Sequence, residues 1–405
     1  MADPRPELQW IAEQQGASRT ALLHLAQINS GSFNADGVAA VADALEPHFA
    51  PLAGPGERIE LAAYTSTADD GSLRERRIGP AVRWRQRPDA PLQVLLCGHM
   101  DTVYGIDSPF QQVRALDEDR LNGPGVADLK GGLLVMSLAL AALERSPHRD
   151  RIGWTVLLNP DEEIGSRGSA PLLARAATQH HLGLIYEPAY ADGNLASSRK
   201  GSGNFDLIVH GRAAHAGRNP GDGRNAVVAA SELIARLYAL NGQRDGLTVN
   251  PAYVHGGGAL NIVPERCVFK FNVRTTQPDD EAWLMQQLAT MQQDIDGRDG
   301  YTLEIRGGFT RPPKVFDDAH QRLAAMIDDC GRQLGLDLQF KPTGGCCDGN
   351  NLAACGLPNI DNLGVVGGEI HSDREWMRVS SLVERAQLSA LLLLRLANGE
   401  LTWSA

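Results

Sequence analysis

Two histidines and several carboxylates stand in short segments where they could bind metal ions. They are His99 and Asp101 in GHMDTV, Asp128 in GPGVADLKGG, Glu162 and Glu163 in DEEIGS, Glu187 in YEPA, and His371 in GEIHSD. Imidazole nitrogens and carboxylate oxygens are protein ligands of zinc, and a pair of metals needs at least one oxygen ligand that can bridge them. A lone histidine after a strand is more often solvated than a ligand, but the whole set predicts a dinuclear metal site.

The elements before these segments explain how residues far apart in the sequence could meet. Short apolar runs at 92–97, 152–158 and 182–186 each lead directly into one of the clusters. Between the first two runs, Leu133, Met136, Leu140 and Leu143 recur at helical spacing. This alternation predicts a mostly parallel sheet covered by helices on both faces, an α/β fold. Such sheets bind ligands at the carboxyl ends of their strands, where the clusters would lie.

The pattern changes between about residue 201 and residue 312. Alternating and helical segments follow one another there in the order β-α-β-β-α-β. That order predicts a ferredoxin-like unit, a four-stranded sheet with two helices on one face. Since 405 residues exceed what one core usually organises, we expect a catalytic domain in two segments, 1–200 and 313–405, with residues 201–312 inserted between them.

Composition limits the partners of the chain. A formal net charge of -11 argues against nucleic-acid binding, because phosphates require a basic face. The N-terminus does not have the pattern of a secretory signal, and no later stretch is expected to cross a bilayer. We therefore expect a cytoplasmic protein that acts on small molecules, with no membrane partner. The six cysteines lack CxxC spacing and are expected to be reduced, and only the adjacent pair Cys346 and Cys347 is a candidate for the active site.

Seven motifs identify a family resemblance. GHMDTV, GPGVADLKGG, DEEIGS, YEPA, HAGRNP, NIVPE and IHSD occur in the order and at the spacings of the aminoacylase and carboxypeptidase family of dinuclear zinc peptidases. The chain most closely resembles the folate-cleaving glutamate carboxypeptidase branch, over nearly its whole length. The resemblance implies two Zn²⁺ per chain, with Asp128 bridging both metals. It implies that His99 and Glu187 complete one site and that Glu163 and His371 complete the other. Cobalt or manganese would also suit these ligands.

The same resemblance leaves Glu162 unbound beside the metals. A carboxylate in that place can take a proton from a metal-bridging water and pass it to the leaving nitrogen, as general base and then general acid. The metals would lower the pKa of that water from about 15.7 to roughly 7. Asp101 is expected to accept a hydrogen bond from the second ring nitrogen of His99 and so orient the imidazole. Family members also have a cis peptide after the bridging aspartate, here between Asp128 and Leu129.

Further residues resemble the family's substrate-binding groups. The resemblance assigns His215 in AAHAGRNP, Asn261 in GALNIVPE and Arg274 to the oxyanion and the substrate carboxylate, which an arginine fork binds well. It also implies a homodimer formed through the insertion, with His215 reaching the active site of the partner.

One loop departs from the family pattern. Relatives usually have two glycines, then Gly, Ser or Thr, and then Asp, whereas this chain has Cys346 and Cys347 between Gly345 and Asp348. The backbone amides of Gly344 and Gly345 could still hold a carboxylate. However, the thiols change the polarity of the loop, so a strict preference for glutamate does not follow.

Together these features predict a metal-dependent hydrolase that cleaves an amide or peptide bond next to a free carboxylate, as a glutamate-carboxypeptidase-like exopeptidase. An N-acyl-amino-acid deacylase or a dipeptidase would use the same metals and base, and the motifs do not separate these activities. A catalytically silent binding protein with this fold would be expected to lack Glu162. A redox role for the cysteine pair could only be an addition to the hydrolase.

Overall fold

A mixed sheet forms the centre of the larger part of the molecule. The structure is a computed structural model that describes residues 4–403. In this range the strand order is β1-β4-β8-β5-β9-β16, and β5 runs parallel to both β8 and β9, while β4 is antiparallel to β8. The strands are β1 Glu57–Ile59, β4 Ala81–Gln86, β5 Leu92–His99, β8 Ile152–Asn159, β9 Leu182–Ile185 and β16 Asn359–Ile360. The predicted mostly parallel sheet is confirmed.

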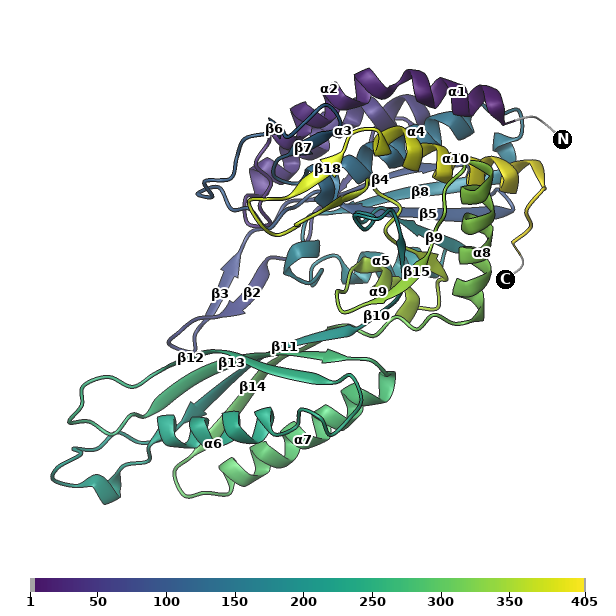
Figure 1. Ribbon diagram of the computed structural model, residues 1–405. Coiled ribbons are helices and arrows are strands. Elements are labelled where there is room, and N and C mark those ends of the chain that lie inside the picture. Colours follow the sequence, from purple (N-terminus) through teal and green to yellow (C-terminus); the bar gives the residue numbers. More distant parts are fainter. Residues whose placement is uncertain (1–3, 404–405) are drawn as a thin grey trace.

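Helices cover both faces of this sheet because both faces are apolar (Figure 1). Val94 and Leu96 of β5 pack into the larger core, whereas the alternate residues Leu95 and Cys97 pack into a smaller one. The helices of the larger core are α1 Arg5–Glu13, α2 Gln15–Ala26, α3 Ala35–Ala53, α4 Gly132–Arg145, α8 Asp318–Gln333 and α10 Ser381–Asn398. The helices of the smaller core are α5 Ala170–Ala177 and α9 Asp348–Ala354.

One helical segment corrects an expectation from the sequence. Residues Val126–Arg145 are long enough and apolar enough to cross a bilayer, with a mean hydropathy of 1.7. In the structure 89% of this apolar stretch is buried inside the protein, and α4 packs against α10. The apolar character of this segment is therefore accounted for by its place in the core of the protein.

The insertion forms a second sheet with its own core. The strand order is β12-β13-β11-β14, and helices α6 and α7 cover one face of the sheet (Figure 1). The bounds are β11 Gly201–His210, α6 Ala226–Tyr238, β12 Thr248–Gly256, β13 Arg266–Thr275, α7 Pro278–Asp296 and β14 Thr302–Arg311. This is the predicted β-α-β-β-α-β order. Its first strand, β11, and its last strand, β14, connect the insertion to the rest of the chain.

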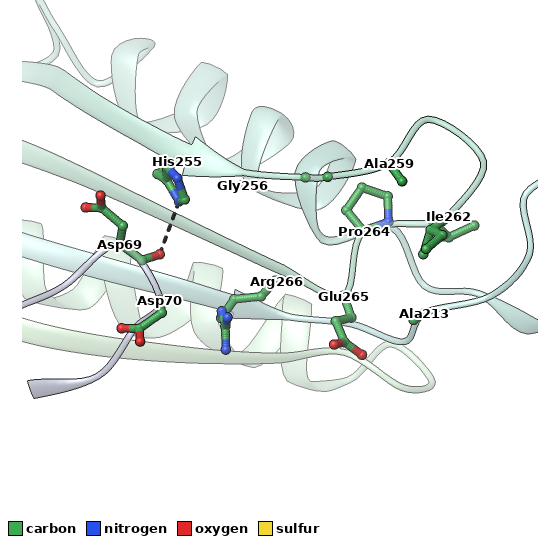
Figure 2. A pocket seen from close by; sticks show the side chains of 13 residues that line it. Asp69, Asp70, Ala213, His255, Gly256, Ala259, Ile262, Pro264, Glu265 and Arg266 are labelled. Carbon is green, nitrogen blue, oxygen red and sulfur yellow. Dashed lines mark hydrogen bonds between the residues drawn. The ribbon is translucent and has the colours of Figure 1, made fainter.

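A hairpin from the larger part contacts the other face of this second sheet. Strands β2 Tyr64–Thr67 and β3 Leu73–Arg76 extend toward β12 and β13 (Figure 1). The Tyr253 hydroxyl donates to Asp69 Oδ1 over 2.6 Å, and Arg306 Nη1 donates to the Gly71 carbonyl over 2.7 Å. Figure 2 shows the cavity of about 270 Å³ at the tip of the hairpin, beside His255 and Arg266. His255 Nδ1 lies 3.2 Å from the Asp69 carbonyl oxygen, so this side chain contacts the hairpin.

Short strands complete the fold and carry loops toward the main sheet. A small four-stranded sheet has the order β17-β18-β7-β6, and β10 pairs with β15 in parallel. Their bounds are β6 Arg114–Ala115, β7 Arg120–Asn122, β10 Leu195–Arg199, β15 Phe340–Thr343, β17 Gly367–Gly368 and β18 Trp376–Arg378.

Candidate active site

The predicted ligands converge at the carboxyl ends of the central strands. His99 is the last residue of β5, Glu163 follows β8 in a short 3-10 turn, and Glu187 follows β9. Asp128 lies in the turn that leads into α4, and His371 lies in the loop after β17. All five line or adjoin one cavity, as expected for the edge of an open α/β sheet.

The two oxygens of Asp128 face two different histidines. Asp128 Oδ1 lies 3.2 Å from His99 Nε2, and Oδ2 lies 3.2 Å from His371 Nε2. The same nitrogen of His371 lies 3.1 Å from Glu163 Oε2, and His99 Nε2 lies 3.9 Å from Glu187 Oε1. The five residues thus divide into two groups that share Asp128.

These residues have the chemistry and spacing of metal ligands. Two atoms bound to one zinc at about 2.1 Å each would lie about 3.4 Å apart, close to the distances found here. Burial, and then the Asp128 carboxylate, raise the pKa of Glu163. Burial, and then the carboxylates of Glu162 and Asp128, raise the pKa of Glu187. Among the described residues, the buried Glu163 Oε1 has no hydrogen-bond partner. Cations would offset the cost of burying so many acidic groups together.

Asp101 organises this site differently from the predicted way. His99 Nδ1 lies 2.9 Å from the Asp101 carbonyl oxygen, whereas the nearest carboxylate oxygen is 3.4 Å away. The Asp101 carboxylate is turned toward other donors, the Ser32 hydroxyl at 2.7 Å and the backbone N–H groups of Glu162 and Glu163 at 3.2 Å each. Asp101 therefore fixes both the imidazole and the turn that carries the two glutamates. A proton on Nδ1 leaves Nε2 free to bind a cation.

The loop of Asp128 is held by Glu375, which we did not predict. The peptide between Asp128 and Leu129 is cis, as the family resemblance implied. Glu375 is fully buried and accepts hydrogen bonds from the backbone N–H groups of Asp128 at 3.0 Å and Ala127 at 2.9 Å. Its other oxygen accepts from the Tyr104 hydroxyl at 2.8 Å. The only sequence signal is an acidic residue four positions after His371.

Glu162 contacts Arg311, which is the second residue of the site that we did not predict. Glu162 is 8% exposed and lines the cavity beside the ligands. Arg311 Nη1 donates to the Glu162 carboxylate. Burial raises the pKa of Glu162, and the Arg311 charge opposes that rise. The sequence shows Arg311 only as an arginine at the end of an alternating strand, which is a common surface pattern.

Two cavities adjoin the ligand cluster. The first has a volume of about 440 Å³ and reaches from the ligands to Arg199 and Cys346. The second has a volume of about 590 Å³ and is lined by Phe33, Arg76 and Ile106. Glu163 lines both cavities, so the two cavities adjoin at this residue of the cluster.

Only part of the loop 344–347 lines the cavity at the ligand cluster. Gly345 and Cys346 line the first cavity, and Arg274 Nη1 lies 3.0 Å from Cys346 Sγ. Gly344, in contrast, lines a different cavity beside Lys200 and Lys314, so the structure does not place it at the ligand cluster. Cys347 is buried near Asp361, and both thiols are free.

His215 and Asn261 lie away from the ligands of their own chain. Both are exposed, and in the described part of the chain neither lines a cavity that contains Glu162. The backbone N–H groups of Gly217 and Arg218 donate to His215 Nδ1 over 3.1 Å each. The Ala216 N–H donates to the Asn261 carbonyl over 2.9 Å, so the two residues belong to adjacent loops of the insertion. This arrangement leaves His215 Nε2 as a hydrogen-bond donor for another group.

Comparisons with known proteins agree with the sequence motifs and the fold. The profile of peptidase family M20/M25/M40 matches residues 95–395. The chain is 30% identical to carboxypeptidase G2 of a Pseudomonas species over 404 residues, which cover 97% of this chain and 92% of that protein. It is 26% identical to succinyl-diaminopimelate desuccinylase 2 of Shewanella loihica, over 76% of this chain and 86% of that protein.

Solved structures share the fold at lower identity. Aminopeptidase PepT of Bacillus cereus has a TM-score of 0.71 and 21% identity, covering 95% of this chain and 99% of that one. The YXEP protein of Bacillus subtilis, described as a dinuclear metal binding peptidase, has a TM-score of 0.62 and 14% identity, covering 96% and 99%. At these identities the likeness establishes the architecture.

Proposed function

The chain belongs to peptidase family M20/M25/M40 and is a metallopeptidase, and we propose that it removes an amino acid with a free carboxylate from an N-acyl or peptide substrate. The observation that carries this proposal is that the ligand cluster and Glu162 line one cavity, which adjoins a second cavity of different character at Glu163. The similarity to carboxypeptidase G2 supports the same activity.

The cavity with Arg199 and Cys346 suits the amino acid that leaves. Arg199 is 9% exposed and lines this cavity, and Arg274 contacts Cys346 at its edge. Arg199 and the buried Lys314 share one carboxylate, Asp361, over 2.9 and 2.8 Å, so their positive charge exceeds the negative charge of their partner. An anionic group on the substrate would balance that excess.

The second cavity suits the acyl group. Its walls include Phe33, Val103 and Ile106, and the last two are 41% and 67% exposed. Exposed apolar side chains beside a catalytic cluster are typical of a binding surface for an apolar group. The Arg76 guanidinium lies over the Phe33 ring, 3.6 Å from its centroid.

Two zinc ions would be held by the shared Asp128, with His99 and Glu187 around one and Glu163 and His371 around the other. When bound, the metals would lower the pKa of a water molecule and polarise the scissile carbonyl, and cobalt or manganese could do the same. Glu162 then takes the proton of the attacking water and delivers it to the leaving nitrogen. Asp101 keeps Glu162 and His99 in place from the side away from the cavity.

A substrate panel tests this assignment. We expect wild-type protein to hydrolyse N-acyl amino acids with a free α-carboxylate and to reject the matching amides. Replacing Arg274 with lysine should lower kcat/KM on the free acids about 10- to 100-fold, because the fork and one charged hydrogen bond are lost. The panel should vary the amino acid among glutamate, aspartate and neutral residues, and the acyl group among aryl, acetyl and aminoacyl groups.

The outcomes of the panel are distinct. Equal hydrolysis of acids and amides would contradict the proposal, and an equal loss on both in Arg274→Lys would give Arg274 a structural role. Preference for succinyl or acetyl groups over aminoacyl groups would favour the deacylase alternative, which the similarity to desuccinylases supports.

We also propose that two chains pair through the insertion. Strand β12 is at an edge of its sheet, and large apolar side chains are exposed on it and on α6 nearby. Val228, Tyr238 and Val254 are 53%, 66% and 55% exposed, and Leu260 in the next loop is fully exposed. An open edge with apolar neighbours is suited to pairing with a second copy. In such a pair, His215 could reach the cavity of the partner, which it does not reach in its own chain.

A mixing experiment tests this shared site without a structure. Glu162→Ala and His215→Ala would be prepared separately, shown to be nearly inactive, then dissociated, mixed in equal amounts and reassociated. If each site takes His215 from the partner, mixed dimers contain one intact site, and activity should return to about a quarter of the wild-type value. If His215 acts within its own chain, every site keeps a lesion and the mixture stays inactive.

A further inference from the structure

Arg311 and Arg274 occupy matched places at one end of the insertion sheet. In the strand registers, Ser202 of β11 is opposite Arg274 of β13 on one side and opposite Arg311 of β14 on the other. The two arginines nevertheless have different surroundings. Arg274 is partly exposed and contacts Cys346, whereas Arg311 is 2% exposed and contacts Glu162.

The Arg311 guanidinium donates hydrogen bonds to two atoms of Glu162. Nη1 donates to the carboxylate oxygen Oε1, and Nη2 donates to the main-chain carbonyl of the same residue over 2.7 Å. A fork that holds both the side chain and the backbone of one glutamate leaves little freedom to its side-chain torsions. Among the described residues, the other carboxylate oxygen of Glu162 has no hydrogen-bond partner, and Glu162 lines the cavity.

The Arg311 guanidinium is itself positioned by hydrogen bonds to buried polar groups. Nη2 also donates to the Ser166 hydroxyl over 2.8 Å, and that hydroxyl donates to Asp348 Oδ1 over 2.5 Å. Asn159 donates to the second oxygen of Asp348 over 2.7 Å. Asp348, Asn159 and Ser166 are all buried. The orientation of Arg311 is therefore set by a chain of buried polar groups that belongs to the larger part of the molecule.

We propose that Arg311 is a positioning residue for Glu162. It holds one carboxylate oxygen and the main chain, so that the other oxygen is directed at the reacting water. This inference rests on the proposed role of Glu162 as the general base. It assigns separate tasks to the two arginines, since Arg311 is buried against Glu162, whereas Arg274 is partly exposed and contacts Cys346 in the wall of the cavity.

Replacing Arg311 with lysine removes the fork and keeps the charge. A displacement of the base by about 1 Å can cost about 100-fold, so we expect kcat to fall about 100-fold while KM changes little. Metal content and binding of the amino-acid product should stay at wild-type values. The matched control is Arg306→Lys, the same exchange on the same strand, where the side chain contacts the hairpin. The control should retain wild-type kcat.

A double substitution separates positioning from a structural effect. If Arg311 acts through the Glu162 carboxylate, Arg311→Lys should cause no further loss of kcat in a Glu162→Gln background. Multiplication of the two losses would overturn the inference, and so would wild-type kcat in Arg311→Lys. Full activity of Glu162→Gln alone would instead overturn the proposed function.

A second variant tests the same inference should Arg311→Lys fold poorly or lose metal. Ser166→Ala leaves Arg311 in place and removes one of its supports. We expect a loss of about tenfold in kcat with unchanged KM and metal content, the usual effect of one hydrogen bond to a charged group. Unchanged kcat in the metal-loaded Ser166→Ala protein would overturn the positioning role.

Discussion

Removal of the bound metals is expected to abolish hydrolysis completely, and added zinc is expected to restore it. The five proposed ligands divide into two groups around the oxygens of Asp128, so metal analysis of active protein should give two divalent ions per chain. The metal-free protein should also melt at a lower temperature, because ions that bind only the folded chain stabilise it. The buried glutamates would otherwise repel one another.

Asp128→Asn provides the matching test within the chain. Since both groups share Asp128, this change should lower the affinity for both metals, whereas Glu187→Gln should affect one. Active protein with one metal or none per chain would contradict the dinuclear site. Full activity after exhaustive chelation would contradict any role of metal in the reaction.

Replacing Glu162 with glutamine is expected to lower turnover by a factor of about 100 to 10,000, the usual contribution of a general base. Glutamine has nearly the same shape, can still accept a hydrogen bond from Arg311, and cannot accept the proton of water at neutral pH. Substrate binding and metal content should therefore remain close to wild type. Steady-state kinetics together with metal analysis of the same preparation would measure both effects.

The neighbouring residue supplies a matched control. Glu163→Gln is the same change one position later, at a residue that lies 3.1 Å from His371 Nε2. We expect Glu163→Gln to lose metal as well as activity. Loss of metal in Glu162→Gln would make Glu162 a ligand, and near-normal turnover would remove it from the role of base.

The position of Arg311 suggests how the insertion and the catalytic sheet depend on each other. Arg311 ends β14 of the insertion, yet it is anchored by Ser166 and contacts Glu162 in the turn after β8. On β13, which is separated from β14 by β11, Arg274 contacts Cys346 of the loop before α9. The contact of Glu162, the proposed base, and the proposed carboxylate site therefore each contain one residue from each part of the molecule.

The sequence by itself determined the elements and the family. Period-two and period-3.6 patterns predicted β5, α4, β8 and β9, and the six elements of the insertion, because local side-chain periodicity follows the backbone conformation. The seven motifs identified the family because a metal cluster needs fixed residue types at strand ends. Their convergence could be predicted as well, since parallel strands present their carboxyl ends at one edge.

Only the tertiary structure decided which side chains meet. Arg311 and Glu162 are 149 positions apart, and nothing local to either residue predicts that contact. The structure also turned the Asp101 carboxylate toward Ser32 and the glutamate turn, and placed Cys346 at the cavity and Gly344 outside it. It left His215 and Asn261 outside the cavity of their own chain. Such contacts depend on rotamers and on packing between distant segments, whereas periodicity reports only which face of an element is buried.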